Sequence, residues 1–379
     1  MIKWKIFYLI LIITAISFIS KFSTALTYAN VSSIPTTEEI IAYLHTIPLP
    51  WYINRDTKPK NIIGDSRIKW SKGWIKQESG NIWSKEITYQ GTLGGSEFNF
   101  KFTDARKIKF HLETSNKYPI VGLEIWLDGK HFEFAYPDLK IEQTTIELAD
   151  NEKNPPHEVR GRFYCFTIPT TLCDLRIKSI EIDNSAKLLS LGKSIKKTLA
   201  ILGDSISGVR GNKNYSFLLS DKINYYLLNA SFAESTMSDE GGFFPGLSRI
   251  KEEIIPFKPD LLIIFLGTND LGRQITLESF SRDYEKAVNI LQKELPKTNI
   301  VLLGLLPRVD YSQEKIATFS AVIKNIASKY NLYYVDTYNW LQEKDLSDGI
   351  HPSVDAQTKL SELLYNYLRG NNLLSEKLR

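Results

Sequence analysis

The sequence TLAILGDS at residues 198–205 decides the fold of the C-terminal half. An apolar run leads directly into Gly203, Asp204 and Ser205, which is typical of a strand buried on both faces that ends in a polar turn. Similar apolar runs recur farther along the chain, at 227–232, 261–266, 300–306 and 332–335. Segments with helical apolar spacing separate or follow these runs, at 215–223, 280–295, 316–327 and 360–367. The alternation predicts a parallel sheet with helices on both faces, and Gly370 is expected to cap the last helix.

The part of the chain between about Ile68 and Asp183 follows a different pattern. Apolar residues alternate with polar ones at 98–102, 108–112 and 123–127, as in strands with one buried face. Asp128-Gly129 separates two such runs and predicts a hairpin turn, because glycine adopts a positive φ without steric cost. This region is therefore expected to form a β-sandwich.

The N-terminus has the layout of a secretory signal. Two lysines precede an apolar run from Ile6 to about Ile19, and small residues follow, so cleavage is expected after Ala25 or Ala29. The run is short for a membrane span, which needs roughly 20 residues, although an uncleaved anchor remains the alternative. No cysteine follows the run, which argues against a lipid anchor.

Four segments follow from these patterns. The prediction is a signal peptide at 1–29, an N-terminal extension at 30–54, a β-sandwich domain at 55–185 and an α/β domain at 195–379. The protein is thus expected outside the cytoplasm: periplasmic, at the cell surface or secreted. The net charge is only +4, from 47 basic and 43 acidic residues, which argues against a nucleic-acid partner. No membrane contact is expected of the mature protein unless the N-terminal segment is retained.

The chain has only two cysteines, Cys165 and Cys173. They lie eight positions apart and could face each other across a short loop in an oxidising compartment. A disulfide and two buried thiols are both compatible with this spacing.

Three polar clusters follow predicted strands or precede the last helix, where ligands bind in parallel sheets. Ser205 is a candidate nucleophile, and His351 is the only histidine after His157, so it is the candidate base. Asp348 lies three residues before His351 and can orient the imidazole. The Asn269 amide and the Ser205 N–H could stabilise an oxyanion. No zinc-ligand spacing, Walker loop or dinucleotide fingerprint occurs, so neither a metal nor another cofactor is expected.

These clusters resemble the blocks of the SGNH/GDSL hydrolases over residues 197–369. The matching stretches are LGDSI at 202–206, GTND at 267–270 and DGIHP at 348–352. The resemblance implies a flavodoxin-like three-layer domain that hydrolyses esters through an acyl-serine. It also implies that Ser205, Asp348 and His351 form the catalytic triad.

One block departs from the family pattern. The resemblance implies a glycine after the second strand, whose N–H helps to bind the oxyanion, but Glu234 stands at that position. Its backbone N–H survives the exchange, so Ser205, Glu234 and Asn269 are the expected oxyanion donors. The alternative is that Gly241 or Gly242 supplies the donor. A carboxylate beside the oxyanion would be unfavourable unless it turns away.

The β-sandwich before the hydrolase resembles the layout of family-two carbohydrate esterases, which pair a jelly roll with an SGNH domain and remove acetyl groups from polysaccharides. The expected activity is hydrolysis of small acyl esters on a carbohydrate or cell-envelope glycan. The alternatives are a lipid esterase or lysophospholipase, an O-acyltransferase on the same core, and a catalytically weak carbohydrate-binding protein. Trp70, Trp74 and Trp83 are candidate sugar contacts, with ordinary core packing as the other interpretation.

Overall fold

The computed structural model describes most of the chain beyond residue 58. The described ranges, which belong to one compact unit, Asp56–Arg379, are 59–81, 84–113, 121–135, 143–148, 154–165, 175–192, 196–208 and 213–374. The expected signal and extension, Trp83 and Cys173 lie outside these ranges, and the Cys165 side chain is not described either. The disulfide, the signal and the domain boundaries therefore stay predictions.

Within the described ranges, no helix is both long enough and apolar enough to cross a membrane.

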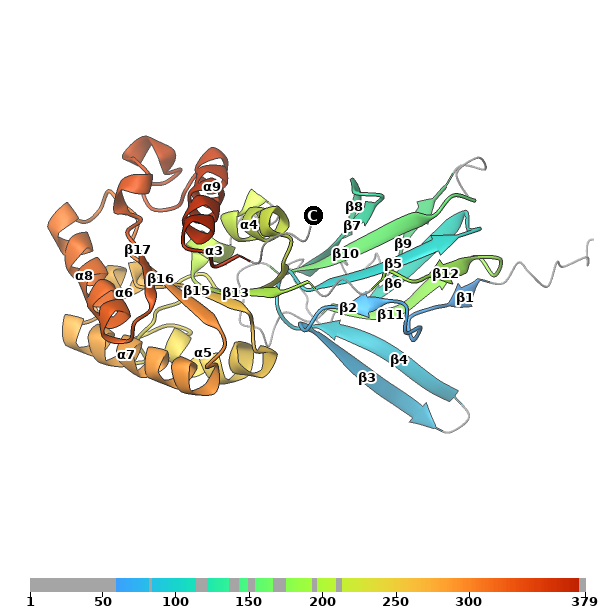
Figure 1. Ribbon diagram of the computed structural model, residues 1–379, viewed down its shortest axis with the longest axis horizontal. Coiled ribbons are helices and arrows are strands. Elements are labelled where there is room, and N and C mark those ends of the chain that lie inside the picture. Colours follow the sequence, from blue (N-terminus) through green and yellow to red (C-terminus); the bar gives the residue numbers. More distant parts are fainter. Residues whose placement is uncertain are drawn as a thin grey trace, which may run out of the picture. The chain divides into compact units, whose positions relative to one another are not determined.

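The N-terminal half contains two antiparallel sheets (Figure 1). The first has the order β3-β4-β11-β6-β9, with β1 also paired to β11. Its strands are β1 (Lys60–Asn61), β3 (Trp74–Asn81), β4 (Ser84–Gly91), β6 (Lys107–Glu113), β9 (Gln143–Glu147) and β11 (Leu175–Ile182). The second has the order β12-β5-β10-β7-β8, with β2 also paired to β5. Its strands are β2 (Lys69–Trp70), β5 (Glu97–Thr103), β7 (Val121–Leu127), β8 (Lys130–Ala135), β10 (His157–Cys165) and β12 (Lys187–Leu189).

The alternating residues of these strands form one core between the two sheets. Phe98 and Phe100 of β5 pack with Ile108 and Phe110 of β6, and all four are fully buried. The hairpin turn lies where it was predicted, with φ values of 52° at Asp128 and 76° at Gly129. The sequence prediction of a β-sandwich is thus confirmed.

The C-terminal half is built on a parallel sheet with the order β14-β13-β15-β16-β17. Its strands are β13 (Thr198–Gly203), β14 (Tyr226–Ser231), β15 (Leu261–Phe265), β16 (Asn299–Leu303) and β17 (Tyr333–Val335). The α-helices of this half are α3 (Ser205–Gly208), α4 (Tyr215–Ile223), α5 (Gly246–Glu253), α6 (Thr268–Gly272), α7 (Leu277–Glu294), α8 (Gln313–Lys329) and α9 (Val354–Gly370). Short 3-10 helices are η4 (Ile255–Phe257), η5 (Tyr338–Trp340) and η6 (Glu343–Asp345).

Helices cover both faces of this sheet (Figure 1). On β13, Ala200 and Leu202 join one core with α5, α7 and α8, whereas Leu199 and Ile201 join another with α3, α4 and α9. Each central strand is therefore apolar on both faces, which explains the uninterrupted apolar runs. The predicted three-layer α/β domain is confirmed.

The expected cap of the last helix is wrong. Helix α9 runs through Gly370, and Asn371 is its C-cap. The left-handed residue that ends the turn is Asn372, with a φ of 55°, and the Leu373 N–H bonds the Leu368 carbonyl at 3.0 Å. Asparagine tolerates this conformation better than most residues, so no glycine is needed there.

The sandwich and the parallel sheet share apolar and backbone contacts. Leu93, which follows β4, belongs to the α/β core on one face of the sheet, and Tyr164 of β10 belongs to the core on the other face. Gly94 forms an antiparallel bridge with Asn229 of the edge strand β14. The sandwich therefore protects an edge that would otherwise present unpaired backbone groups.

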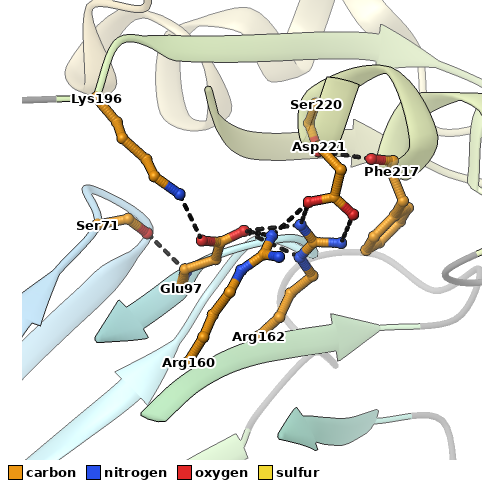
Figure 2. A network of polar contacts seen from close by, with 8 residues as sticks. All are labelled: Ser71, Glu97, Arg160, Arg162, Lys196, Phe217, Ser220 and Asp221. Carbon is orange, nitrogen blue, oxygen red and sulfur yellow. Dashed lines mark hydrogen bonds and ion pairs between the residues drawn. The ribbon is translucent and has the colours of Figure 1, made fainter. Parts of the chain in front are cut away.

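A buried ionic network also links the two parts (Figure 2). The Arg162 side chain of β10 is fully buried and donates to Glu97 of β5 at 2.8 and 3.0 Å. It also pairs with Asp221 of α4, and Arg160 contacts both carboxylates at 2.5 Å. Burial alone would lower the pKa of Arg162, but the carboxylates outweigh it and raise the pKa, so the guanidinium stays charged.

Replacing Arg162 tests the weight of this network. Arg162→Met keeps the length of the side chain but leaves the buried Glu97 with fewer cationic partners, so we expect a loss of about 3 kcal/mol in the free energy of unfolding. Arg176→Met is the matched control, because Arg176 is partly exposed and its nitrogen lies 3.9 Å from Glu113, so the expected loss is under about 1 kcal/mol. Urea denaturation measures both, and equal losses would contradict a dominant role for the network.

Candidate active site

Ser205 begins helix α3, and a single residue, Asp204, separates it from the end of strand β13. The turn requires glycine at position 203, because a Cβ there would lie 2.6 Å from the Ser207 Oγ and 2.9 Å from the Ser231 Oγ. Buried Asp204 holds the other side of the turn, since its Oδ1 accepts the Ile206 N–H at 2.9 Å. Burial raises the pKa of Asp204 to about 7.

Three side-chain amides fix helix α3 from outside. The Ile206 carbonyl accepts hydrogen bonds from Asn214 at 2.9 Å and from Gln357 at 3.1 Å. The Ser207 carbonyl accepts one from Asn229 at 2.9 Å. Sequence reasoning did not find these supports, although a glutamine within the apolar face of the last helix is an unusual core residue that invites the question.

His351 lies against Ser205. The distance from Ser205 Oγ to His351 Nε2 is 2.8 Å, and that from His351 Nδ1 to Asp348 Oδ2 is 2.7 Å. The structure thus joins the three residues into one hydrogen-bonded series across 146 positions of sequence. Such a series lets a hydroxyl transfer its proton to the imidazole.

The short turn before α9 positions the acidic member. Asp348 Oδ1 accepts the N–H groups of Ile350 at 3.0 Å and His351 at 2.7 Å. Burial would raise the pKa of Asp348, but the His351 N–H, its ring and the Ile350 N–H together lower it to about 2. Because the carboxylate stays ionised above that pH, it can stabilise an imidazolium. Gly349 has a φ of 84°, and a Cβ there would meet Val309 at 2.4 Å.

The expected oxyanion donors lie on three neighbouring elements. Asn269 in α6 donates one amide hydrogen to the Ser235 carbonyl at 3.0 Å, and among the residues that the structure describes its second amide hydrogen has no acceptor. Within the described ranges, the Ser205 and Glu234 N–H groups donate no hydrogen bond. All three residues therefore keep a hydrogen available for a ligand.

The Glu234 side chain turns outward. Its backbone has a φ of 61°, the left-handed region in which glycine is favoured, and its carboxylate lies 2.6 Å from the Arg273 Nη2. Arg273 in turn lies over the exposed Phe243 ring, 5.1 Å from its centroid. This positive φ explains why the family resemblance led us to expect a glycine at position 234.

Asp270 anchors the loop that carries Glu234. It is fully buried and accepts the N–H groups of Met237 at 2.8 Å and Ser238 at 2.9 Å. Burial raises the pKa of Asp270 to about 6. Asn269 and Asp270 thus both hydrogen-bond to the loop segment from Ser235 to Ser238. This role of Asp270 was not predicted from the sequence.

Two of the three tryptophans that were candidate sugar contacts pack in the sandwich core. Trp74 is buried in the sandwich core, and Trp70 packs against it and stacks on Tyr89 with ring centroids 3.7 Å apart. These two are core residues, whereas Trp83 falls outside the described ranges.

A parallel α/β sheet with a Ser-His-Asp series beside its strand ends is an arrangement of serine hydrolases. Residues 201–359 match the model of the GDSL-like Lipase/Acylhydrolase family. The resemblance to the SGNH/GDSL hydrolases that the sequence predicted is therefore confirmed for these residues.

Two curated relatives are esterases. The chain is 25% identical over 181 residues to a multidomain esterase of Ruminococcus flavefaciens, and the aligned region covers 43% of this chain and 23% of that protein. It is 23% identical over 221 residues to an acetylxylan esterase of Xylanibacter ruminicola, and the aligned region covers 48% of this chain and 45% of that protein. The chain thus spans less than half the length of these relatives.

The two-part layout recurs in a solved structure. A family two carbohydrate esterase from Clostridium thermocellum, in complex with cellohexaose, matches with a TM-score of 0.65 at 13% identity. The match covers 81% of this chain and all of that one. It shows a shared fold that includes the sandwich.

Exchanging Glu234 tests whether its carboxylate affects ester turnover. Because the side chain is paired with Arg273 and glycine adopts this φ freely, Glu234→Gly should change turnover of p-nitrophenyl acetate by less than about twofold. Arg273→Ala should lower turnover, since the released carboxylate can approach the oxyanion, and the double variant should restore it. A several-fold rise in Glu234→Gly alone would mean that the carboxylate obstructs the site. Loss of activity with the fold intact would make Glu234 part of the catalytic machinery.

Proposed function

We propose that the chain is an exported serine esterase that hydrolyses small acyl esters, acetyl esters foremost, on a carbohydrate or cell-envelope glycan. The observation that carries this proposal is the series from Ser205 through His351 to Asp348 within a GDSL-type domain. The esterase relatives and the two-part layout support a carbohydrate ester as the substrate. The secretory layout of residues 1–29 supports export.

The reaction proceeds through an acyl-serine. The Ser205 Oγ attacks the ester carbonyl while its proton passes to His351 Nε2, and the resulting imidazolium is stabilised by Asp348. The tetrahedral intermediate collapses, the C–O bond to the alcohol breaks, and His351 returns the proton to the departing oxygen. Water then attacks the acyl-serine and gives a proton to His351. The bond between the acyl carbon and Ser205 Oγ breaks, His351 returns the proton to that oxygen, and the acid is released. These steps require no cofactor.

The oxyanion of each tetrahedral intermediate is bound by the Ser205 N–H, the Glu234 N–H and the free amide hydrogen of Asn269. Their other contacts support this assignment, because the loop is held in place by Asn269 and Asp270 before a substrate binds. Removal of one such donor typically costs 10²–10³ in rate in other hydrolases, or roughly 3 kcal/mol.

Substitution of the three residues tests the mechanism. Ser205→Ala and His351→Ala should each lower kcat for p-nitrophenyl acetate by about 10³ or more, and Asp348→Asn should lower it by a smaller factor. The matched controls are Ser248→Ala and His131→Ala, which alter exposed residues elsewhere and should leave kcat unchanged. Near wild-type turnover in Ser205→Ala would refute the mechanism.

The acyl group and the acceptor are tested with substrates. We expect acetate release from acetylated polysaccharides, and a preference for acetyl over octanoyl p-nitrophenyl esters. A small pocket would exclude the longer chain despite a gain of about 0.8 kcal/mol per buried CH₂. A rate that rises steadily with chain length would identify a lipid esterase. Transfer of the acyl group to an added alcohol in preference to water would identify an acyltransferase.

A further inference from the structure

The outer face of the sheet β12-β5-β10-β7-β8 carries aromatic and charged side chains that the proposed reaction does not use. Ile125 of β7 and Val159 of β10 point into the sandwich core, so the next residues along each strand lie on the opposite face. These are Trp126 and Arg160, which are direct register partners. The alternation seen in the sequence therefore places a tryptophan outside the core.

Helix α4 covers one part of this face through the Arg162–Asp221 contact, and a cavity of about 640 Å³ occupies another part. Arg160 and Asp221, which lie together in Figure 2, both line the cavity, and Trp126, Lys101, His157 and Glu158 line it as well. This volume falls within the range of roughly 300–1,000 Å³ that is usual for small-molecule sites.

The charged groups of the cavity are paired with one another or with the buried network. Lys101 Nζ lies 3.0 Å from Glu158 Oε2, and His157 Nδ1 lies 2.7 Å from Asp128 Oδ2. Arg160 binds Asp221 at 2.5 Å. A charged ligand would have to displace these partners, whereas a neutral ligand rich in hydroxyl groups can use the remaining lone pairs and hydrogens.

The indole of Trp126 is held before any ligand arrives. The guanidinium carbons of Arg160 and Arg162 lie 4.7 and 5.3 Å from its ring centroid, and His131 contacts it edge-on at 5.5 Å. A fixed aromatic ring beside paired polar groups suits a ring-shaped ligand with an apolar face and a polar rim. Holding the ring in advance reduces the ordering that binding requires.

We infer that this cavity is a carbohydrate-binding site that takes a short segment of a neutral glycan, with a sugar ring packed against Trp126. The site is separate from Ser205, so it goes beyond the proposed esterase activity. Binding here retains a polymer on the sandwich while the hydrolase domain acts on it. Loss of the site therefore affects polymeric substrates and leaves small activated esters unaffected.

Affinity gel electrophoresis of the full chain with arabinoxylan, glucomannan, hydroxyethylcellulose or polygalacturonate tests the inference. At least one of the three neutral polymers should retard wild type and Ser205→Ala equally. Trp126→Ala should bind that polymer about tenfold more weakly and keep its turnover of p-nitrophenyl acetate. Tyr333→Ala is the matched control, because Tyr333 is an exposed aromatic residue of β17. It should bind like wild type.

Glu158→Arg provides a second variant, since the Glu158 side chain is 44% exposed and the new side chain fills the cavity without removing Trp126. It should also lose retardation while its thermal unfolding resembles that of wild type. The inference is overturned if no neutral polymer retards the wild type, or if both variants bind as it does. Stronger retardation by polygalacturonate than by the neutral polymers would overturn the assignment to neutral glycans. These outcomes do not depend on whether Ser205 is the nucleophile.

Discussion

The buried charge of Arg162 constrains the arrangement around it. A guanidinium without solvent contact needs carboxylates nearby, and these come from two parts of the fold, Glu97 in the sandwich and Asp221 in α4. Helix α4 is thereby tied to the sandwich, and its N-cap Asn214 donates to the Ile206 carbonyl of α3. Helix α4 thus connects Arg162 of the sandwich with helix α3, which begins with Ser205.

The acidic residues of the first two matching blocks, at 202–206 and 267–270, support the backbone and take no direct part in the proposed reaction. Asp204 and Asp270 are both buried, and each accepts backbone N–H groups of a functional turn. Burial raises the pKa of each, in contrast to Asp348, whose pKa falls because two N–H groups and a histidine surround it. Carboxylates in one edge of the fold therefore have different roles, which depend on their solvation and hydrogen-bond donors.

Much of the fold and of the candidate site could be predicted from the sequence, because the sequence patterns that indicate them lie within short segments. Uninterrupted apolar runs and period-two runs reflect the burial of their own segments, and each of the three polar blocks spans only a few consecutive residues. The role of Gln357 could not be read in this way, since its partners Ile206 and Tyr215 lie more than 140 positions earlier. The same holds for Glu234, whose orientation depends on Arg273, 39 positions later.

The energetics of Glu234 explain why its departure from glycine is tolerated. A left-handed backbone costs a residue with a Cβ roughly 1–2 kcal/mol, and an exposed ion pair such as that with Arg273 returns at most about 1 kcal/mol. The exchange is therefore mildly unfavourable at this residue and needs support from elsewhere. That support comes from the hydrogen bond that Asn269 donates to the Ser235 carbonyl and from those that Asp270 accepts from Met237 and Ser238, because they fix the backbone on the C-terminal side of residue 234. The proposed oxyanion contact needs only the N–H direction, which that backbone determines, so the side chain can differ while the donor remains.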